Sequence, residues 1–371
     1  MIRAFLVDDE EPARERLKRL LAEIDGVEVV GESADGEDAL REIPRSKPDL
    51  VFLDIQMPVR TGMEVAATLP PPRPRIIFCT AFDQYAIQAF EQHAVDYLLK
   101  PLSRERLRAA VGKVRDTVES EERILRELSS ASEAQALLYP SGCTDLATLE
   151  VSGACRSARE VGGDYYDFLP LGDGRLALVV GDVSGKGLFA GLLMAGLQGR
   201  IQSLARRYGD ELEPFMAELN RVMHALTGSN RYATLFYGVY DDAARRLTYV
   251  NAGHPAALVI RPEGEAGEIG AGVEMLSATG TVVGLLPEAL YHQASIRLAP
   301  GELLLIFSDG LLETQDSEGK ELGIEGIVSV ARKHSRGNAS EIRDGILQEA
   351  EARRTGAPPE DDVTLVVARV R

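Results

Sequence analysis

Two aspartates, Asp164 and Asp182, stand at equal distances from the centre of a predicted β-hairpin. The apolar runs Tyr165–Leu171 and Arg175–Val180 flank a Gly-Asp-Gly sequence, which is strong turn chemistry. A turn centred on Asp173 places the two aspartates opposite each other, because each lies nine positions from that centre. Two ionised carboxylates so close repel each other unless a cation lies between them. The pattern therefore predicts a divalent metal site at the open end of the hairpin.

Two further strand ends carry the same chemistry. A buried run ends at Phe307 and is followed by Asp309, and the last strand, Val363–Val370, is preceded by Asp361 and Asp362. Aspartate also forms turns, which would explain any one of these strand ends alone. Turn formation explains the whole set poorly, since the hairpin aspartates lie at the far end from their turn. An all-carboxylate set suits Mg²⁺ or Mn²⁺, and not zinc or copper.

Five segments together resemble the motifs of a known enzyme family. They are REVGGDYYDF (159–168), GDVSGKG (181–187), NAGHP (251–255), FSDGLLE (307–313) and EDDVTLVV (360–367). In this order they resemble PPM-type metal-dependent Ser/Thr protein phosphatases. The resemblance is closest to the bacterial branch that regulates sigma factors by dephosphorylating anti-sigma-factor antagonists. It covers residues from about 140 to 371 and implies an α/β/β/α sandwich.

The resemblance implies a role for each member of the acidic set. Two metal ions, Mn²⁺ or Mg²⁺, would activate water for in-line attack on a phosphate ester. Asp182 would bridge them, and Asp164 would hold waters bound to them. The further ligands implied are the Val183 carbonyl, Asp309 and Asp361, with Asp362 kept as a less favoured alternative to its neighbour.

Three other features near these motifs have open interpretations. No arginine obviously matches the substrate-contacting one of eukaryotic family members, so phosphate capture would rest on the metals alone or together with Arg159. His254 is either a general base or a structural hydrogen-bonding residue, and it is left outside the catalytic set. GDVSGKG also resembles a phosphate-binding P-loop. That motif needs four residues between its glycines and Ser or Thr after the lysine, whereas Gly187 follows Lys186 here.

Residues 1–118 predict a second domain with its own acidic site. Amphipathic stretches such as Pro12–Ile24 and Gly36–Ile43 separate five short apolar runs: Ile2–Val7, Val27–Gly31, Leu50–Leu53, Arg75–Cys79 and Ala94–Leu98. This alternation predicts a five-stranded parallel sheet with helices on both faces. Sites in such sheets lie at the carboxyl ends of the strands. The residues found there are Asp8, Asp9, Asp54, Thr80 and Lys100, a set that can hold Mg²⁺ and a phosphoryl group.

This stretch resembles a response-regulator receiver domain with a flavodoxin-like fold. The resemblance implies that Asp54 is the phosphoacceptor and that Mg²⁺ is bound by Asp9 directly, by Asp8 through water and by the Gln56 carbonyl.

The resemblance also assigns the switch residues of the receiver. Thr80 and Lys100 would contact the phosphoryl group, Tyr97 would be the switch aromatic, and the Lys100–Pro101 bond would be cis. On the residues alone, Tyr97 could be an ordinary half-exposed strand residue and Thr80 a helix N-cap.

A long helix is predicted from Ser103 to Leu138, across a linker at 119–139 that leads to the phosphatase domain at 140–371. Its apolar residues form a heptad seam: Leu107, Val111, Val114, Val118, Leu125 and Leu128. Glu121, Ser132 and Gln135 take the remaining seam positions, and polar residues there weaken packing. We interpret the seam as a homodimeric coiled coil that could act as a two-state element. The alternative is that Leu107–Val118 packs on the receiver and the rest is solvated.

Composition narrows the class of protein. The length of 371 residues predicts two domains, and the net charge of −17 argues against a nucleic-acid partner. Three cysteines without CxxC spacing argue against a disulfide framework. No apolar run reaches the roughly 18 residues of a membrane span, and the first run is too short for a signal peptide. A cytoplasmic protein without a membrane partner is expected.

Together the two domains predict a two-component response regulator that is an enzyme. A sensor histidine kinase would phosphorylate the receiver, which would control a phosphoserine/phosphothreonine phosphatase acting on an anti-sigma-factor antagonist. The alternative is a signalling scaffold whose phosphatase fold is silent and binds a partner under receiver control. The intact aspartate set favours the enzyme, since a binding module needs no metal ligands.

Overall fold

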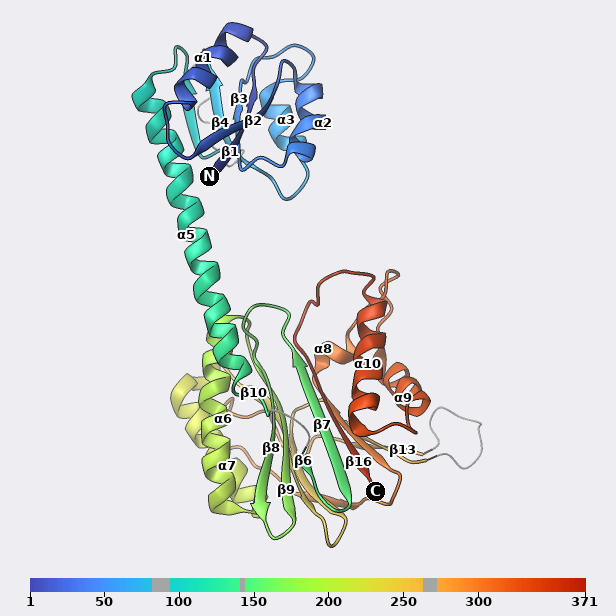
Figure 1. Ribbon diagram of the computed structural model, residues 1–371. Coiled ribbons are helices and arrows are strands. Elements are labelled where there is room, and N and C mark those ends of the chain that lie inside the picture. Colours follow the sequence, from blue (N-terminus) through green and yellow to red (C-terminus); the bar gives the residue numbers. More distant parts are fainter. Residues whose placement is uncertain (82–93, 141–143, 263–271) are drawn as a thin grey trace. The chain divides into compact units, whose positions relative to one another are not determined.

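The computed structural model describes residues 1–81, 94–140, 144–262 and 272–371. The chain divides into two units, Met1–Arg126 and Glu127–Arg371 (Figure 1). The division falls inside helix α5 (Arg104–Ala136), a single continuous helix that nearly matches the one predicted from Ser103 to Leu138. The domain limits at 118 and 140 stay predictions. The sequence at 262–274 is rich in Gly and Glu and predicts an exposed loop, most of which lies outside the described residues.

The first unit is a five-stranded parallel sheet with the strand order β2-β1-β3-β4-β5, which confirms the flavodoxin-like prediction. The strands are β1 (Ile2–Val7), β2 (Val27–Ser33), β3 (Leu50–Leu53), β4 (Arg75–Thr80) and β5 (Asp96–Leu99). The helices described beside them are α1 (Glu11–Leu21), α2 (Gly36–Ser46), α3 (Gly62–Thr68) and the first half of α5. Helices cover both faces, so the central strands are apolar throughout and do not alternate.

The seam predicted along α5 is used differently in its two halves. Leu107, Val111 and Val114 are buried in the receiver core, and Val118 packs against it. These four residues are therefore not free to pair with a second helix, as the alternative interpretation held. Leu125 is 56% exposed in the chain. The homodimeric coiled coil stays a prediction for the part of the helix beyond Val118.

The second unit contains two antiparallel sheets. The first has the order β14-β11-β10-β9-β8 and the second β13-β12-β15-β16-β7-β6. The strands of the first are β8 (Asp164–Gly172), β9 (Arg175–Val183), β10 (Ala233–Asp241), β11 (Arg246–Ala252) and β14 (Ala294–Arg297). Those of the second are β6 (Thr144–Asp145), β7 (Leu149–Arg156), β12 (Ala257–Ile260), β13 (Val273–Leu276), β15 (Leu303–Phe307) and β16 (Val363–Val370).

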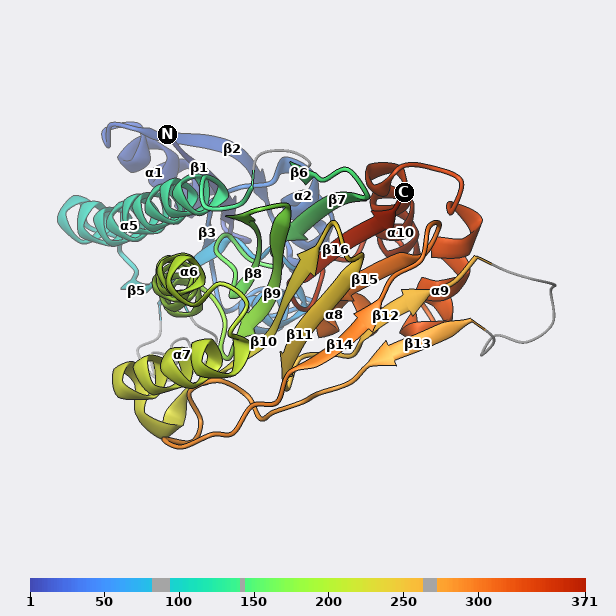
Figure 2. The same cartoon turned by 90° about the horizontal axis from the view of Figure 1, so that it is seen from below.

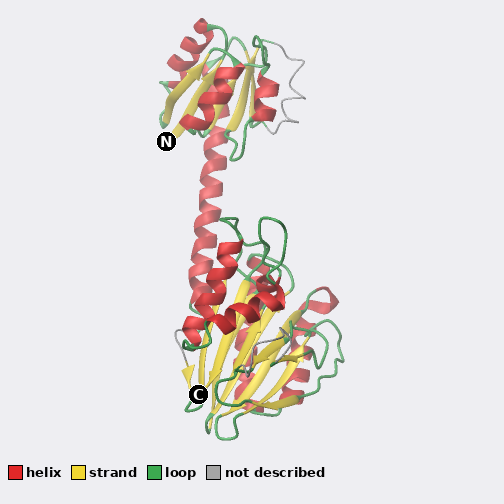
Figure 3. Cartoon of the chain, turned by 90° about the vertical axis from the view of Figure 1, so that its right-hand side faces the viewer, coloured by secondary structure: helices red, strands yellow, loops and turns green. Residues whose placement is uncertain are grey.

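Helices cover the outer face of each sheet, which confirms the predicted α/β/β/α sandwich (Figures 2 and 3). The first sheet carries α6 (Leu188–Tyr208) and α7 (Leu212–Thr227), and the second carries α8 (Asp309–Leu312), α9 (Gly323–Lys333) and α10 (Ala339–Arg353). A third core lies between the sheets. Side chains of a strand alternate between faces, so Tyr165 enters the helix-facing core and Tyr166 the core between the sheets.

Within the described ranges of the chain, we find no helix that combines the length and the apolar character needed to cross a bilayer.

Candidate functional site

Asp8, Asp9 and Asp54 meet at the carboxyl edge of the receiver sheet. Asp8 follows β1 and Asp54 follows β3, and these two strands are hydrogen-bonded neighbours. Ligand oxygens of the three carboxylates lie within 4.8 Å of one another. Asp8 and Asp54 are buried, whereas Asp9 is exposed. Three oxygen donors at this spacing suit a hard divalent cation.

Lys100, at the end of β5, reaches the same carboxylates. Its Nζ lies 2.8 Å from Asp8 Oδ2 and 2.7 Å from Asp54 Oδ2. Burial raises the pKa of Asp54, and the hydrogen bond from Lys100 opposes this only in part. Burial would lower the pKa of Lys100, but the bonds to Asp54 and Asp8 raise it above its usual value. The ammonium is thus held where it could neutralise a phosphoryl group on Asp54.

The remaining predicted receiver residues surround this site. Thr80 is fully buried at the end of β4, and its hydroxyl has no hydrogen-bond partner among the residues that the structure describes. The Gln56 N–H donates to Asp54 Oδ1 at 3.3 Å. Tyr97 lies on β5 and is buried, not half exposed. The Lys100–Pro101 bond is cis, as predicted.

The phosphatase-like unit forms the predicted hairpin. Asp164 on β8 lies directly opposite Asp182 on β9, and Asp182 lies opposite Thr234 on β10. The central turn residue Asp173 has φ 51°, as a tight hairpin turn requires. Residues opposite each other on antiparallel strands point to the same face. Asp164, Asp182 and Thr234 therefore form one row, called the polar row below.

The second sheet supplies Asp309 and Asp361 from neighbouring strands. Asp309 follows β15 and begins α8, and Asp361 leads into β16, which pairs with β15. The two segments approach so closely that a Cβ on Gly310 would lie 2.1 Å from the carbonyl oxygen of Asp362. The glycine of the FSDG sequence is therefore required by this contact.

The carboxylates of this site repel one another. Burial and then the charges of Asp309 and Asp361 raise the pKa of Asp182 to about 7. Burial and the charge of Asp182 raise the pKa of Asp164 well above its ordinary value. Asp164 Oδ2 is buried and has no hydrogen-bond partner among the described residues. An oxygen-only set whose negative charges raise one another's pKa fits a pair of divalent cations.

Lys186 forms an ion pair with one of the phosphatase aspartates, a contact that the sequence analysis did not predict. Its Nζ lies 2.9 Å from Asp361 Oδ2 and 3.0 Å from the Glu360 carbonyl oxygen. Among the described residues, the acidic side chains whose ligand oxygens all lie within 4.8 Å of one another are Asp8, Asp9 and Asp54 of the receiver. The phosphatase aspartates are not brought together to that distance. The sequence analysis treated Lys186 only as part of a failed P-loop. Its place directly after the Asp182 loop was the available signal.

Asp362 has different surroundings from Asp361. Its Oδ1 accepts a hydrogen bond from the Ala158 N–H at 2.8 Å and its Oδ2 from the Gly163 N–H at 2.7 Å. Both carboxylate oxygens are thus engaged by the backbone of the loop 157–163. The side chain ties this loop to β16 and so holds the segment that carries Asp164. Arg159 is exposed in the same loop.

The last turn of α5 and the residues just after it also bind the loop 157–163 and Asp164. The Gln135 Nε2 donates to the Gly162 carbonyl oxygen at 2.7 Å, and the Gly162 N–H donates to Gln135 Oε1 at 3.0 Å. The Tyr139 hydroxyl donates to the Asp164 carbonyl oxygen at 2.9 Å, and its ring stacks on Tyr166. Gln135 is therefore not the polar interruption of a free seam that the sequence suggested. Its partner lies 27 residues away, and no local pattern reveals it.

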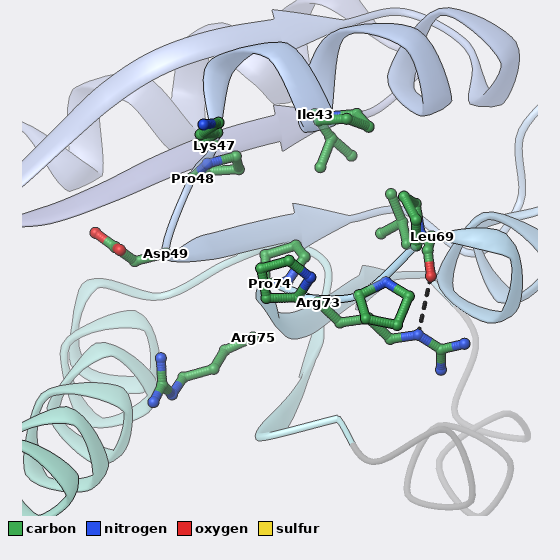
Figure 4. Close-up of a pocket in the computed structure, with 12 residues that line it drawn as sticks. Ile43, Lys47, Pro48, Asp49, Leu69, Arg73, Pro74 and Arg75 are labelled. Carbon is green, nitrogen blue, oxygen red and sulfur yellow. Dashed lines mark hydrogen bonds between the residues drawn. The ribbon is translucent and has the colours of Figure 1, made fainter. Parts of the chain in front are cut away.

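Two hollows differ in their relation to these sites. A groove of about 400 Å³ adjoins the phosphatase aspartates and is lined by residues that include Lys186, Glu313, Arg354 and Asp361. A hollow of about 450 Å³ lies at the amino ends of β3 and β4 in the receiver (Figure 4). There the Arg73 Nε donates to the Leu69 carbonyl oxygen at 2.9 Å. This second hollow contains none of the predicted site residues.

Comparison with known families gives two matches. Residues 172–371 match stage II sporulation protein E (SpoIIE), and residues 4–112 match the response regulator receiver domain. The chain is also similar to curated proteins. It is 45% identical over 145 residues to the transcriptional regulatory protein BtsR of Salmonella typhi, covering 39% of this chain and 59% of that protein. An uncharacterized response regulatory protein of Yersinia pestis is 54% identical over 108 residues, 29% of this chain and 45% of that one. The chain thus spans about half the length of these relatives.

Solved structures share the fold of the second unit. The SiaA-PP2C domain of Pseudomonas aeruginosa has a TM-score of 0.57 at 18% identity, covering 67% of this chain and 98% of that one. A phosphatase domain of SpoIIE from Bacillus subtilis, solved with a fragment of its regulatory domain, has a TM-score of 0.52 at 23% identity. That match covers 61% of this chain and 64% of the other. At these identities the similarity shows the fold alone.

Proposed function

The chain belongs to the stage II sporulation protein E (SpoIIE) family and carries a response regulator receiver domain, and from this premise we propose a regulated enzyme. It is a metal-dependent phosphoserine/phosphothreonine protein phosphatase whose activity follows phosphorylation of its own receiver. The observation that carries the proposal is the acidic group of Asp164, Asp182, Asp309 and Asp361, in which Asp164 is buried and Asp182 is partly buried. A fold kept only for binding has no reason to bring together carboxylates that raise one another's pKa.

In this proposal each residue has one task. Asp182, Asp309, Asp361 and the Val183 carbonyl hold two Mn²⁺ or Mg²⁺ ions, and Asp164 orients water. Asp361 is preferred to Asp362 because both carboxylate oxygens of Asp362 already accept backbone hydrogen bonds. When bound, such a metal pair supplies an activated water and stabilises the charge that develops on the phosphoryl group.

Two basic side chains, Lys186 and Arg159, are proposed to bind the phosphate group of the substrate. Lys186 pairs with Asp361 at 2.9 Å in the chain and becomes free to neutralise a phosphoryl oxygen once Asp361 binds metal. Arg159 is exposed on the loop held by Asp362 and provides a second candidate contact. The groove beside Asp361 and Lys186 has the volume to take residues that flank a phosphorylated side chain.

The receiver provides the input. Asp54 accepts the phosphoryl group from a sensor histidine kinase, and Mg²⁺ binds Asp8, Asp9 and the Gln56 carbonyl. Lys100 and the hydroxyl of Thr80 contact the phosphoryl oxygens. Tyr97 is the switch aromatic. A stretch of 145 residues of the chain is 45% identical to part of a transcriptional regulatory protein, but the proposed output here is hydrolysis.

The output is proposed to act on a phosphorylated anti-sigma-factor antagonist, as the bacterial branch of the family does. Helix α5 carries the signal, because it starts in the receiver unit and its last turn binds the loop before Asp164. In a homodimer, the exposed parts of two α5 helices would pair, and this pairing could exist in two registers that receiver phosphorylation selects between.

Hydrolysis of p-nitrophenyl phosphate by the full-length chain with Mn²⁺ tests the enzyme directly. The expected result is turnover that needs the metal and is lost with a chelator. Absence of turnover with both Mn²⁺ and Mg²⁺, before and after receiver phosphorylation, would favour the silent scaffold. A pull-down of phosphoproteins with an inactive variant would then identify the substrate, and the proposal expects a small anti-sigma-antagonist domain.

A further inference from the structure

The NAGHP segment between β11 and β12 forms a rigid loop around His254. The Asn251 Oδ1 accepts a hydrogen bond from the His254 N–H at 2.9 Å, and the Asn251 Nδ2 donates to the Leu276 carbonyl oxygen at 3.1 Å. Gly253 has φ 67°, and a Cβ there would lie 2.6 Å from Val282 Cγ1. Backbone and side-chain contacts therefore fix the place of the histidine in the loop.

The ring of His254 is buried and is held through one nitrogen. Only 4% of the residue is exposed, and its Nδ1 lies 2.8 Å from Thr234 Oγ1, whereas its Nε2 has no hydrogen-bond partner among the described residues. Burial lowers the pKa of His254 to about 3, although the backbone of Phe307 opposes this shift. The imidazole is therefore neutral near pH 7 and does not meet solvent or substrate. These observations argue against the general-base role that the sequence left open.

The residue bonded to the ring, Thr234, and the strand beside β12, which is β15, each adjoin a proposed metal ligand. Thr234 lies directly opposite Asp182 in the polar row, on the first sheet. Phe307 is the last residue of β15, two positions before Asp309, on the second sheet. Thr234 is hydrogen-bonded to the ring, and His254 itself lies on the segment that leads into β12, which pairs with β15 in the second sheet. His254 thus links the end of β10 to the sheet that carries Asp309.

We propose that His254 is a positioning residue that sets the separation of Asp182 and Asp309 across the two sheets. The inference rests on the proposed function, in which these two aspartates share a metal pair. Groups that orient metal ligands from behind commonly change metal affinity about 10- to 100-fold when they are removed. A residue that only fills the core would change stability and leave the affinity for metal at the parental value.

The test measures Mn²⁺ binding to metal-free, full-length protein by calorimetry. An Asp9→Asn background weakens the receiver site, so that the titration reports on the phosphatase aspartates. Thr234→Val removes the hydroxyl that holds the ring and keeps the shape of the side chain, and Thr234→Ser keeps the hydroxyl as the matched control. His254→Phe keeps an aromatic ring and removes both nitrogens. Amide hydrogen exchange at 181–184 and 307–310 is measured in the same proteins without metal.

We expect Thr234→Val and His254→Phe to bind Mn²⁺ about 10- to 100-fold more weakly, and Thr234→Ser to bind like the parent. Exchange at both segments should be faster in the first two variants. If His254→Phe does not fold, the Thr234 pair decides the question alone. Parental affinity and parental exchange in Thr234→Val would overturn the proposal. If the parent binds no Mn²⁺, the proposed metal-dependent function fails, and the exchange data still show whether His254 holds the two segments.

Discussion

The side-chain amide of Gln135 makes two hydrogen bonds to one residue, Gly162, at 2.7 and 3.0 Å. Gly162 lies two positions before Asp164, and the Tyr139 hydroxyl binds the Asp164 carbonyl oxygen directly. The end of α5 is therefore attached to the backbone of the loop that precedes a proposed catalytic residue. A small displacement of the helix would move this loop, because both contacts are made to the main chain.

The first prediction concerns Gln135→Leu. Leucine leaves the N–H and carbonyl of Gly162 without these partners, and each unsatisfied buried group costs about 1–3 kcal/mol. We expect a lower free energy of unfolding for the second unit, and phosphatase activity that no longer responds to a small phosphodonor. Urea denaturation and p-nitrophenyl phosphate hydrolysis, with and without the donor, measure these effects.

Ser132→Leu is the matched control for that experiment. It changes another seam position of α5 in the same way and leaves the Gln135 contacts intact. The seam argument alone expected that replacing Glu121, Ser132 and Gln135 with leucine would uncouple the domains by locking one register. Glu121, however, forms an ion pair with Arg75 of the receiver. A parental response in Gln135→Leu together with a lost response in Ser132→Leu would support the seam and refute the Gly162 contact.

The second prediction concerns Asp182→Asn. The substitution removes the carboxylate shared by the proposed metal pair, so activity should fall by several orders of magnitude while the fold persists. Hydrolysis of p-nitrophenyl phosphate at saturating Mn²⁺ measures the activity, and circular dichroism checks the fold. Asp173→Asn, in the exposed hairpin turn, should behave like the parent. Retained turnover in Asp182→Asn would sink the two-metal mechanism.

The place of Asp164 opposite Asp182 was predictable because local chemistry determines it. A Gly-Asp-Gly turn fixes the register of an antiparallel hairpin, and the register then decides which residues face each other. The receiver site was predictable for a similar reason, since Asp8 and Asp54 end neighbouring parallel strands.

Other elements depend on contacts that no local pattern encodes. Strand β7 was not predicted, since Gly153 is a poor strand former, yet a Cβ at that position would lie 2.4 Å from the Tyr166 ring. Helix α9 was also missed, because it begins at Gly323 and contains Gly326, which disfavour helix in isolation. The bond between Thr234 and His254 joins residues 20 positions apart and exists only once β10 and β11 have paired.

The third prediction concerns the input. Incubation with a labelled small phosphodonor and Mg²⁺ should phosphorylate the chain once, on Asp54, beside the Lys100 ammonium at 2.7 Å. Asp54→Asn should take up no label, whereas Asp116→Asn, on the exposed face of α5, should take up as much as the parent. Label that persists in Asp54→Asn would show that another residue is the nucleophile.

The fourth prediction concerns the exposed part of α5. Ile124 is 50% and Leu125 is 56% exposed, so both are available to a second copy of the helix. If the homodimer forms there, Leu125→Glu should shift the molar mass measured by light scattering from that of a dimer to that of a monomer. Glu122→Gln, one turn away, should leave the mass unchanged. A monomeric parent at every concentration, with and without phosphodonor, would remove the coiled coil from the proposal.

The last prediction concerns the stability of the second unit as a function of pH. The pKa of His254 is lowered by burial to about 3, below the ordinary value of 6.5. Between these values the unfolded chain binds a proton that the folded chain does not, so the free energy of unfolding rises with pH and is lost as pH falls. A difference of one pKa unit between the folded and unfolded chain corresponds to ~1.4 kcal/mol in the free energy of unfolding. A change of one or two pH units is therefore enough to measure the loss of stability.

Buried carboxylates act in the opposite direction, because the raised pKa of Asp164 favours the folded state as pH falls. The test is therefore the difference between the parent and His254→Phe, in urea denaturation between about pH 5 and 7. The parent should lose stability more steeply than the variant as pH falls. His292→Phe, which replaces an exposed histidine, should follow the parent. Equal slopes in the parent and His254→Phe would mean that His254 becomes protonated inside the folded protein without penalty.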